Sequence, residues 1–256
     1  MNPKLYDLIH GNKKSKIDST EELSKYDIAL EAAIAEEADK IMQAQDPNIN
    51  KFSTPEQRKA QIAREITESI NLDQMGDLLN NAFHILCTEG KNYLESESYE
   101  ILIIDIQSMV QRLDTLDPIS LDDNTLNKAL NFSPLGIHSI LKISIAKFEE
   151  GFLKESLALS TLLTILEPKE VDFWFRQGII AKSCAIYDLA IYAFDVVNDL
   201  APEFIGGYII KAECYLDSTN KDQAIALMPK IKTLAETTIE EKWKKNVIDL
   251  ETLLSA

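Results

Sequence analysis

The side chains that could do chemistry are few, and none has a spacing typical of an enzyme. The three histidines, His10, His84 and His138, are far apart in the sequence, so no pair has the HExxH spacing of a zinc protease. We expect His84, which follows Phe83 in a helical stretch, to be a half-buried packing residue. The sequence also has no glycine-rich phosphate loop and no GxSxG nucleophile pattern. The sequence therefore gives no indication of catalysis by histidine or serine, or of phosphate binding.

The cysteines and the paired acidic residues also lack a reactive pattern. Cys87, Cys184 and Cys214 are odd in number and widely spaced, which disfavours disulfides and a zinc site and fits a reducing cytosol. Neighbouring acids such as Glu36–Glu37 and Asp122–Asp123 are typical of solvated helix faces. We predict no catalytic residue, no metal and no cofactor. An enzyme with a site formed between the two halves of the chain stays a less favoured alternative.

The net charge and the lack of long apolar runs limit the kinds of partner that we expect. A formal net charge of -16 repels nucleic acid and anionic lipid, so we expect neither as a partner. The first residues contain no apolar stretch typical of a signal peptide, and the longest apolar run is only Leu189 to Phe194. We therefore expect a cytoplasmic protein without membrane insertion.

Glycine and proline, at eight each, are scarce, which favours long helices over many short strands.

The N-terminal half is predicted to be helical. Residues 1–18 carry four lysines and indicate a flexible tail. Helical spacing of apolar residues follows over about 21–45, 71–89 and 97–116, and Thr54-Pro55-Glu56 is typical of a helix start. Gly90 is the expected C-cap of the helix before it. Residues 19–131 are therefore predicted to form an N-terminal helical domain.

One stripe in this domain could mediate self-association. It consists of apolar residues three or four apart on the first helix: Leu23, Tyr26, Leu30 and Ile34. Such a stripe suits a partner helix in a homodimer. The alternative, that it packs inside its own domain, is equally compatible with the sequence.

A regular repeat begins after residue 136. Leu166-Glu167-Pro168 aligns with Leu200-Ala201-Pro202. The interval between these two segments is 34 residues. At this interval, two aligned positions always hold a small residue: the first holds Ser144, Gly178 and Ala212, and the second holds Ser156, Ala190 and Ala224. Two more hold Ser160, Phe194 and Met228, and then Leu163, Val197 and Ile231. Small residues at the same place in each repeat indicate helices that cross closely.

This pattern resembles the tetratricopeptide repeat, a helix-turn-helix unit with a period of roughly 34 residues. The resemblance predicts three helix pairs within residues 135–256. A capping helix from Thr238 to Leu254, with Trp243, Val247, Leu250 and Leu253 as its apolar residues, would close the stack. The predicted fold is all-α: an N-terminal helical domain, three tetratricopeptide-type helix pairs and a C-terminal capping helix, the last two forming an α-solenoid.

Three short sequence segments are more specific than the repeat pattern alone. Phe148-Glu149-Glu150-Gly151, Tyr187-Asp188-Leu189-Ala190-Ile191 and Ala212-Glu213-Cys214-Tyr215-Leu216 resemble the class II chaperones of bacterial type III secretion systems, in the same order. The resemblance covers roughly residues 135–235. It implies a bacterial cytoplasmic chaperone that holds a secreted client, a translocator or an effector, and that dimerises through N-terminal helices. Unlike that family, this chain has a long N-terminal segment before its repeats. A repeat adaptor in a larger assembly is the alternative function.

The expected client site is the face lined by the first helix of each pair. In the tetratricopeptide register, this face carries Leu141, Ile145, Phe148, Phe175, Ile179, Lys182, Ile209 and Leu216. Only Lys182 could clamp a peptide carboxylate, so we expect a groove for apolar side chains of an extended segment. The alternative is that the N-terminal domain fills this groove and the same residues are core.

Overall fold

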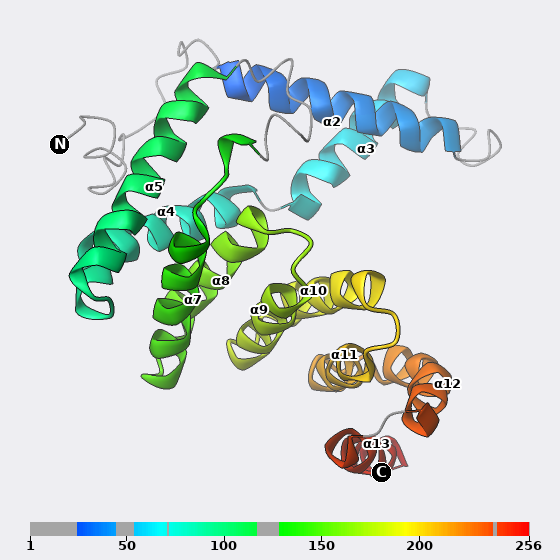
Figure 1. Cartoon of the computed structure of the whole chain (residues 1–256). Helices are drawn as coiled ribbons and strands as arrows, with labels where there is room; N and C mark the ends of the chain where they lie inside the picture. Colours follow the sequence, from blue (N-terminus) through cyan, green and yellow to red (C-terminus); the bar gives the residue numbers. More distant parts are fainter. Residues whose placement is uncertain (1–24, 45–53, 71, 117–127, 238–239, 256) are drawn as a thin grey trace. The chain divides into compact units, whose positions relative to one another are not determined.

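The computed structural model describes residues 25–44, 54–70, 72–116, 128–237 and 240–255, and within these ranges the regular structure is entirely helical (Figure 1). In the first half, the helices are α2 (Lys25–Ala44), α3 (Pro55–Ile70), α4 (Leu72–Thr88), the 3-10 helix η1 (Gly90–Asn92) and α5 (Ser96–Thr115). In the second half, they are α7 (Pro134–Glu149), α8 (Leu153–Leu166), α9 (Val171–Ser183), α10 (Tyr187–Leu200), α11 (Ile205–Asp217), α12 (Lys221–Thr237) and α13 (Glu241–Ser255). The predicted all-α class is confirmed. In these ranges, no helix is both long and apolar enough to cross a membrane.

The chain divides into two compact units that do not follow one cut in the sequence. One unit is Met1–His84 with Ile103–Phe132, and the other is Ile85–Leu102 with Ser133–Ala256. The predicted boundaries near residues 18, 131 and 135 stay a prediction, and the predicted tail 1–18 lies outside the described residues.

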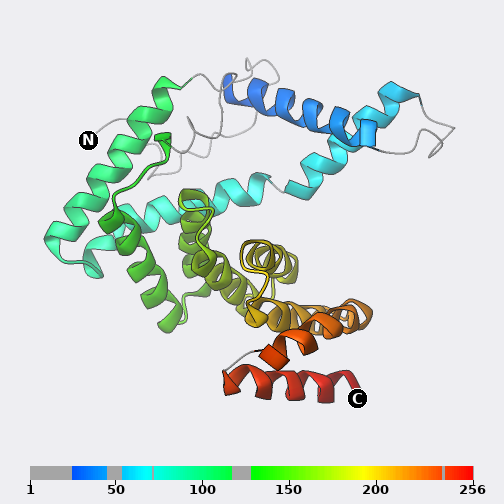
Figure 2. The same ribbon diagram turned by 45° about the vertical axis from the view of Figure 1, so that its right-hand side comes forward.

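In the second unit, three helix pairs follow one another in the predicted register (Figures 1 and 2). The first helices of the pairs, α7, α9 and α11, end at Glu149, Ser183 and Asp217, which occupy the same position of the repeat. The second helices, α8, α10 and α12, begin at Leu153, Tyr187 and Lys221 with the same spacing. The two helices of each pair pack together, and the second one also packs on the element that follows, so each pair buries its neighbour's apolar face.

The turn inside each pair repeats with the same period. Gly151, Ala185 and Thr219 have positive φ angles of 83°, 58° and 64°. After each of them, the next backbone N–H donates to a carbonyl five residues back, at 2.7 to 2.9 Å, which closes a Schellman-type turn. Of these three residues, only Gly151 is a glycine, the residue type that adopts positive φ readily. Ala185 and Thr219 adopt it because the helices on either side fix the turn.

The aligned small residues lie at the close helix crossings, as predicted. In the first pair, the crossing is polar: Ser156 Oγ donates to the Ser144 carbonyl oxygen at 2.8 Å, and both serines are buried. In the second pair, a Cβ added to Gly178 would lie 2.6 Å from Phe194 Cζ. Phe194 is fully buried, so this crossing depends on the missing side chain of Gly178.

Polar side chains connect successive pairs at equivalent positions. Gln177 Nε2 on α9 donates to Thr161 Oγ1 on α8 at 2.9 Å. One repeat later, Lys211 on α11 pairs with Asp195 on α10. Gln177 and Lys211 are both buried, so each bond satisfies a polar group inside the interface between two pairs.

The end of the stack is covered by α13, which confirms the predicted capping helix. Trp243, Val247 and Leu250 are buried, while Leu253 is 60 % exposed. The Trp243 ring lies edge-on against Phe204, with centroids 5.8 Å apart. Its indole carbons would be 2.7 Å from a Cβ added to Gly206, so a second glycine permits this contact.

The turn between α4 and α5 packs on the first helix pair. Lys147 on α7 has a side chain only 4 % exposed, and its Nζ lies 2.6 Å from Glu89 Oε2. The same ammonium lies over the rings of Phe152 and Tyr93, and the Tyr93 hydroxyl donates to Glu150 Oε2 at 2.9 Å. Burial lowers the pKa of Lys147, but the hydrogen bonds and the charge of Glu89 outweigh it and raise the pKa overall.

Gly90 in this turn does not cap a helix as predicted. It begins η1, and the left-handed glycine of the described chain is Gly151 instead. Gly90 is buried, and a Cβ there would lie 3.2 Å from the Tyr99 ring. Its small size therefore serves a close approach of backbone and ring.

In the other unit, α2 and α3 pack together and Lys59 Nζ pairs with Asp39 Oδ2 at 2.6 Å. The predicted start of α3 is confirmed as a capping box. Gln57 N donates to Thr54 Oγ1 at 3.2 Å, and Thr54 N donates to Gln57 Oε1 at 3.0 Å.

The crossing at Gly178 can be tested by adding one methyl group. Gly178→Ala should lower the free energy of unfolding by about 1–3 kcal/mol, because Phe194 must move within a closed core. Gly76→Ala on α4 is the control, since its Cβ would meet nothing within 4 Å. That change should stabilise by about 0.5–1 kcal/mol through helix propensity. If urea unfolding shows that both variants change the free energy of unfolding in the same direction, this packing is contradicted.

Candidate functional site

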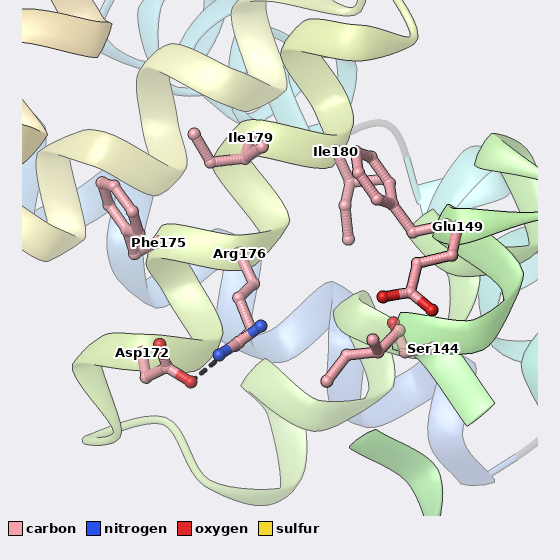
Figure 3. A pocket seen from close by; sticks show the side chains of 9 residues that line it. Ser144, Glu149, Asp172, Phe175, Arg176, Ile179 and Ile180 are labelled. Carbon is pink, nitrogen blue, oxygen red and sulfur yellow. Dashed lines mark hydrogen bonds and ion pairs between the residues drawn. The ribbon is translucent and has the colours of Figure 1, made fainter. Parts of the chain in front are cut away.

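A hollow of about 360 Å³ lies between α7 and α9, on the side expected to bind a client (Figure 3). It is lined by Ser144, Ile145, Phe148, Glu149, Asp172, Phe175, Arg176, Ile179 and Ile180. All of these residues belong to the first helices of the first two pairs. Both helices pack on α8, and their side chains leave this space open between them.

Most of the lining is apolar. The structure brings together four of the predicted groove residues, Ile145, Phe148, Phe175 and Ile179. Phe148 is 36 % exposed, and the other three are partly buried. Apolar surface of this kind gains free energy when a partner covers it.

Phe175 is fixed by aromatic neighbours behind the hollow. Its ring lies edge-on to Phe194, at 5.8 Å between centroids, and to Phe204, at 5.1 Å. Such arrangements are favourable beyond the buried area, so they hold the ring in one orientation. Phe175 is therefore both a wall of the hollow and a packing residue of the second and third pairs.

Three charged side chains belong to the lining of the hollow, one from α7 and two from α9. Arg176 Nε lies 2.6 Å from Asp172 Oδ2, one helical turn away on α9. Glu149, the last residue of α7, is exposed, and Figure 3 shows its carboxylate turned toward the space between the two helices. The residue pattern could have shown the Asp172–Arg176 pair from its four-residue spacing, whereas the position of Glu149 depends on where α7 ends.

The other predicted groove residues lie outside the hollow. Ile209 is fully buried, so it has no surface to offer a client. Leu141 and Leu216 are partly buried and do not line the hollow. The expected apolar strip therefore does not continue onto α11 through Ile209, because that side chain is part of the buried core.

Lys182 is occupied by an ion network. Its Nζ lies 3.0 Å from Glu213 Oε2 and 3.3 Å from Asp217 Oδ2, both on α11. Burial lowers the pKa of Lys182, but the bonds to Glu213 and Asp217 outweigh this and raise it. By the repeat register, these charges occupy the place that Phe148, Ile179 and Ser183 occupy one pair earlier. The face lined by α7, α9 and α11, here called the A-helix face, is mainly apolar between α7 and α9 and carries the Lys182 ion network between α9 and α11.

Of the residues considered for catalysis, His10 and Asp122–Asp123 lie outside the described residues, and the described ones do not line the hollow. Burial raises the pKa of Cys214 to about 12, and it also raises the pKa of Cys87 and Cys184. All three are thiols at neutral pH, which makes them poor nucleophiles. His84 is exposed rather than half-buried as predicted, whereas its chain neighbours Phe83 and Ile85 are buried.

The predicted self-association stripe lies on or before α2. Leu23 falls outside the described residues, and Tyr26, Leu30 and Ile34 belong to α2. Ile34 is partly buried, and α2 packs on α3 of the same chain. Dimerisation through this stripe stays a prediction.

No protein-family model matches the sequence, and no curated protein matches it significantly. Solved structures with similar helix arrangements include the type III secretion translocator chaperone SycD of Yersinia enterocolitica, with 15 % identity over 48 % of this chain and 90 % of that one, at a TM-score of 0.42. PcrH of Pseudomonas aeruginosa matches with 14 % identity over 49 % of this chain and 93 % of that one, at a TM-score of 0.43. A chain of the CopN-Scc3 complex matches with 15 % identity over 62 % and 99 %, at a TM-score of 0.48. The suspected family is therefore represented among the structural neighbours of this chain.

The ion network at Lys182 predicts a salt-dependent contribution to stability. Lys182→Gln should lower the free energy of unfolding by about 0.5–1 kcal/mol, because Glu213 and Asp217 lose a shared cation that is 27 % exposed. In 1 M salt, the difference should shrink through screening. Lys142→Gln removes an exposed lysine from α7 and should change little. Equal losses for both variants, or no effect of salt, would contradict the network.

Proposed function

We propose that this protein is a chaperone that binds an extended apolar segment of another protein in the hollow between α7 and α9. The single observation that carries this proposal is the open space lined by Ile145, Phe148, Phe175 and Ile179. An extended segment could place one apolar side chain there while the side chains on either side of it stay in water. Its affinity would rest on a few buried anchors.

The client class follows from the resemblance in the sequence. We propose a protein secreted by a bacterial type III system, held in the cytoplasm before export. The net charge of -16 supports such a role, because it keeps a complex with an apolar segment in solution. Self-association through α2 belongs to the same proposal.

The lining residues differ in how well they separate binding from folding. Phe175 packs on Phe194 and Phe204, so Phe175→Ala should destabilise the fold as well as weaken binding. Phe148 lines the hollow and is 36 % exposed, so its removal should cost much less stability. Phe148→Ala is the cleaner probe of client binding.

We expect Phe148→Ala to weaken client binding by about 1–3 kcal/mol, a typical loss for a buried aromatic anchor. Ile225→Ala is the matched control, because Ile225 is 48 % exposed on α12 and lies outside the hollow. Tagged wild-type and variant proteins would be recovered from the native cell, and their partners compared by mass spectrometry. A partner that is kept by Ile225→Ala and lost by Phe148→Ala is expected.

If every variant retains the same partner, the hollow does not bind it. Co-expression then distinguishes the chaperone from an adaptor. A chaperone client should be insoluble alone and soluble with this protein, whereas an adaptor's partner should be soluble on its own.

A further inference from the structure

We infer that the hollow is specific for an apolar side chain accompanied by a basic one, and that Glu149 binds the cation. This inference rests on the proposed function, because it names the chemistry of the segment that enters the same hollow. The preferred segment carries Lys or Arg two positions away from its apolar anchor.

Glu149 is the charged group of the hollow that is available to a ligand. Its carboxylate is exposed at the end of α7 and faces the space that the apolar residues line (Figure 3). Among the described residues, it has no ion-pair partner within 4.0 Å, whereas Arg176 is already paired with Asp172 at 2.6 Å. A ligand cation at Glu149 would therefore form a new pair, and a ligand anion at Arg176 would have to compete with Asp172.

The charged residues at the hollow and at the neighbouring ion network are also mainly acidic. At the hollow and the neighbouring ion network, four carboxylates stand against two cations: Glu149, Asp172, Glu213 and Asp217 against Arg176 and Lys182. Lys182 is held by two of these carboxylates, so it does not offer a site for a peptide carboxylate. An apolar segment that carries acidic residues is disfavoured on this face, and a basic one is attracted.

The spacing of two positions follows from an extended backbone. Side chains alternate between opposite sides of such a segment, so the neighbour of the anchor points away from the hollow. The side chain two residues along returns to the same side, about 6.6 Å away at roughly 3.3 Å per residue. A lysine or arginine there can lay its methylene stem on the apolar lining and place its charge at the edge of the hollow, where Glu149 lies.

The test uses labelled peptides of defined sequence as probes. Each peptide has one phenylalanine in a serine and glycine background, and three versions carry Lys, norleucine or Glu two positions from it. Dissociation constants are measured by fluorescence anisotropy at low and at high salt. With the wild-type protein, the Lys peptide should bind roughly 2–5-fold more tightly than the norleucine peptide at low salt, the size expected for an exposed ion pair. The Glu peptide should bind most weakly.

Two variants locate the effect. Glu149→Gln should remove the preference for Lys over norleucine. Glu155→Gln makes the same change in charge on α8, outside the hollow, and should keep the preference. Equal binding of the Lys and norleucine peptides to the wild type would overturn the inference and leave the apolar hollow standing. The same loss in both variants would show a general charge effect and would also overturn it. If none of the peptides binds, the proposed peptide-binding function fails and the specificity fails with it.

Discussion

The contact between Gly178 and Phe194 is the constraint on which the rest of the repeat stack depends. The ring of Phe194 occupies the space that any larger residue at 178 would take, and it is fully buried there. Because protein interiors are close-packed, a ring displaced from this position has nowhere to go without moving a helix. The crossing of α9 and α10, which is the central pair, is therefore set by the absence of one side chain.

That contact also positions the candidate site. Phe194 supports Phe175 from behind, Phe204 contacts the same ring, and Trp243 of the capping helix contacts Phe204. A series of edge-to-face contacts thus runs from α13 to the wall of the hollow. The site is built on rigid helices with a packed support, as a binding surface with preorganised anchors requires. The Lys182 network then limits the apolar surface to the first two pairs, since it fills the equivalent place in the next interval with charge.

The sequence predicted the parts of this structure that repeat. Small residues at 144, 178 and 212 and aliphatic residues at 163, 197 and 231 indicated the helix crossings and the core, because packing demands the same sizes in each unit. The left-handed turn residues Ala185 and Thr219 could not be identified in this way, since neither is a residue type that favours positive φ.

The candidate site was only partly predictable for a related reason. The register shows which residues share a face, and it placed Ile145, Phe148, Phe175 and Ile179 together. It does not show how deeply each is buried, so Ile209 was assigned to the same surface although it is core. Partners across helices, such as Lys182 with Glu213, depend on distances in space. Glu149 belongs to this group as well, because its place in the lining depends on where α7 ends.

Isoleucine methyl NMR tests the central claim, that the hollow between α7 and α9 binds an extended apolar segment, most directly. Ile145, Ile179 and Ile180 line the hollow, whereas Ile225 and Ile248 are exposed elsewhere in the same unit, and each has a δ1 methyl that can be observed. On titration with a peptide that carries a single phenylalanine, the first three resonances should shift together and saturate, and the other two should stay in place. Shifts confined to Ile225 or Ile248, or no shift at the hollow when binding is saturated, would contradict this account.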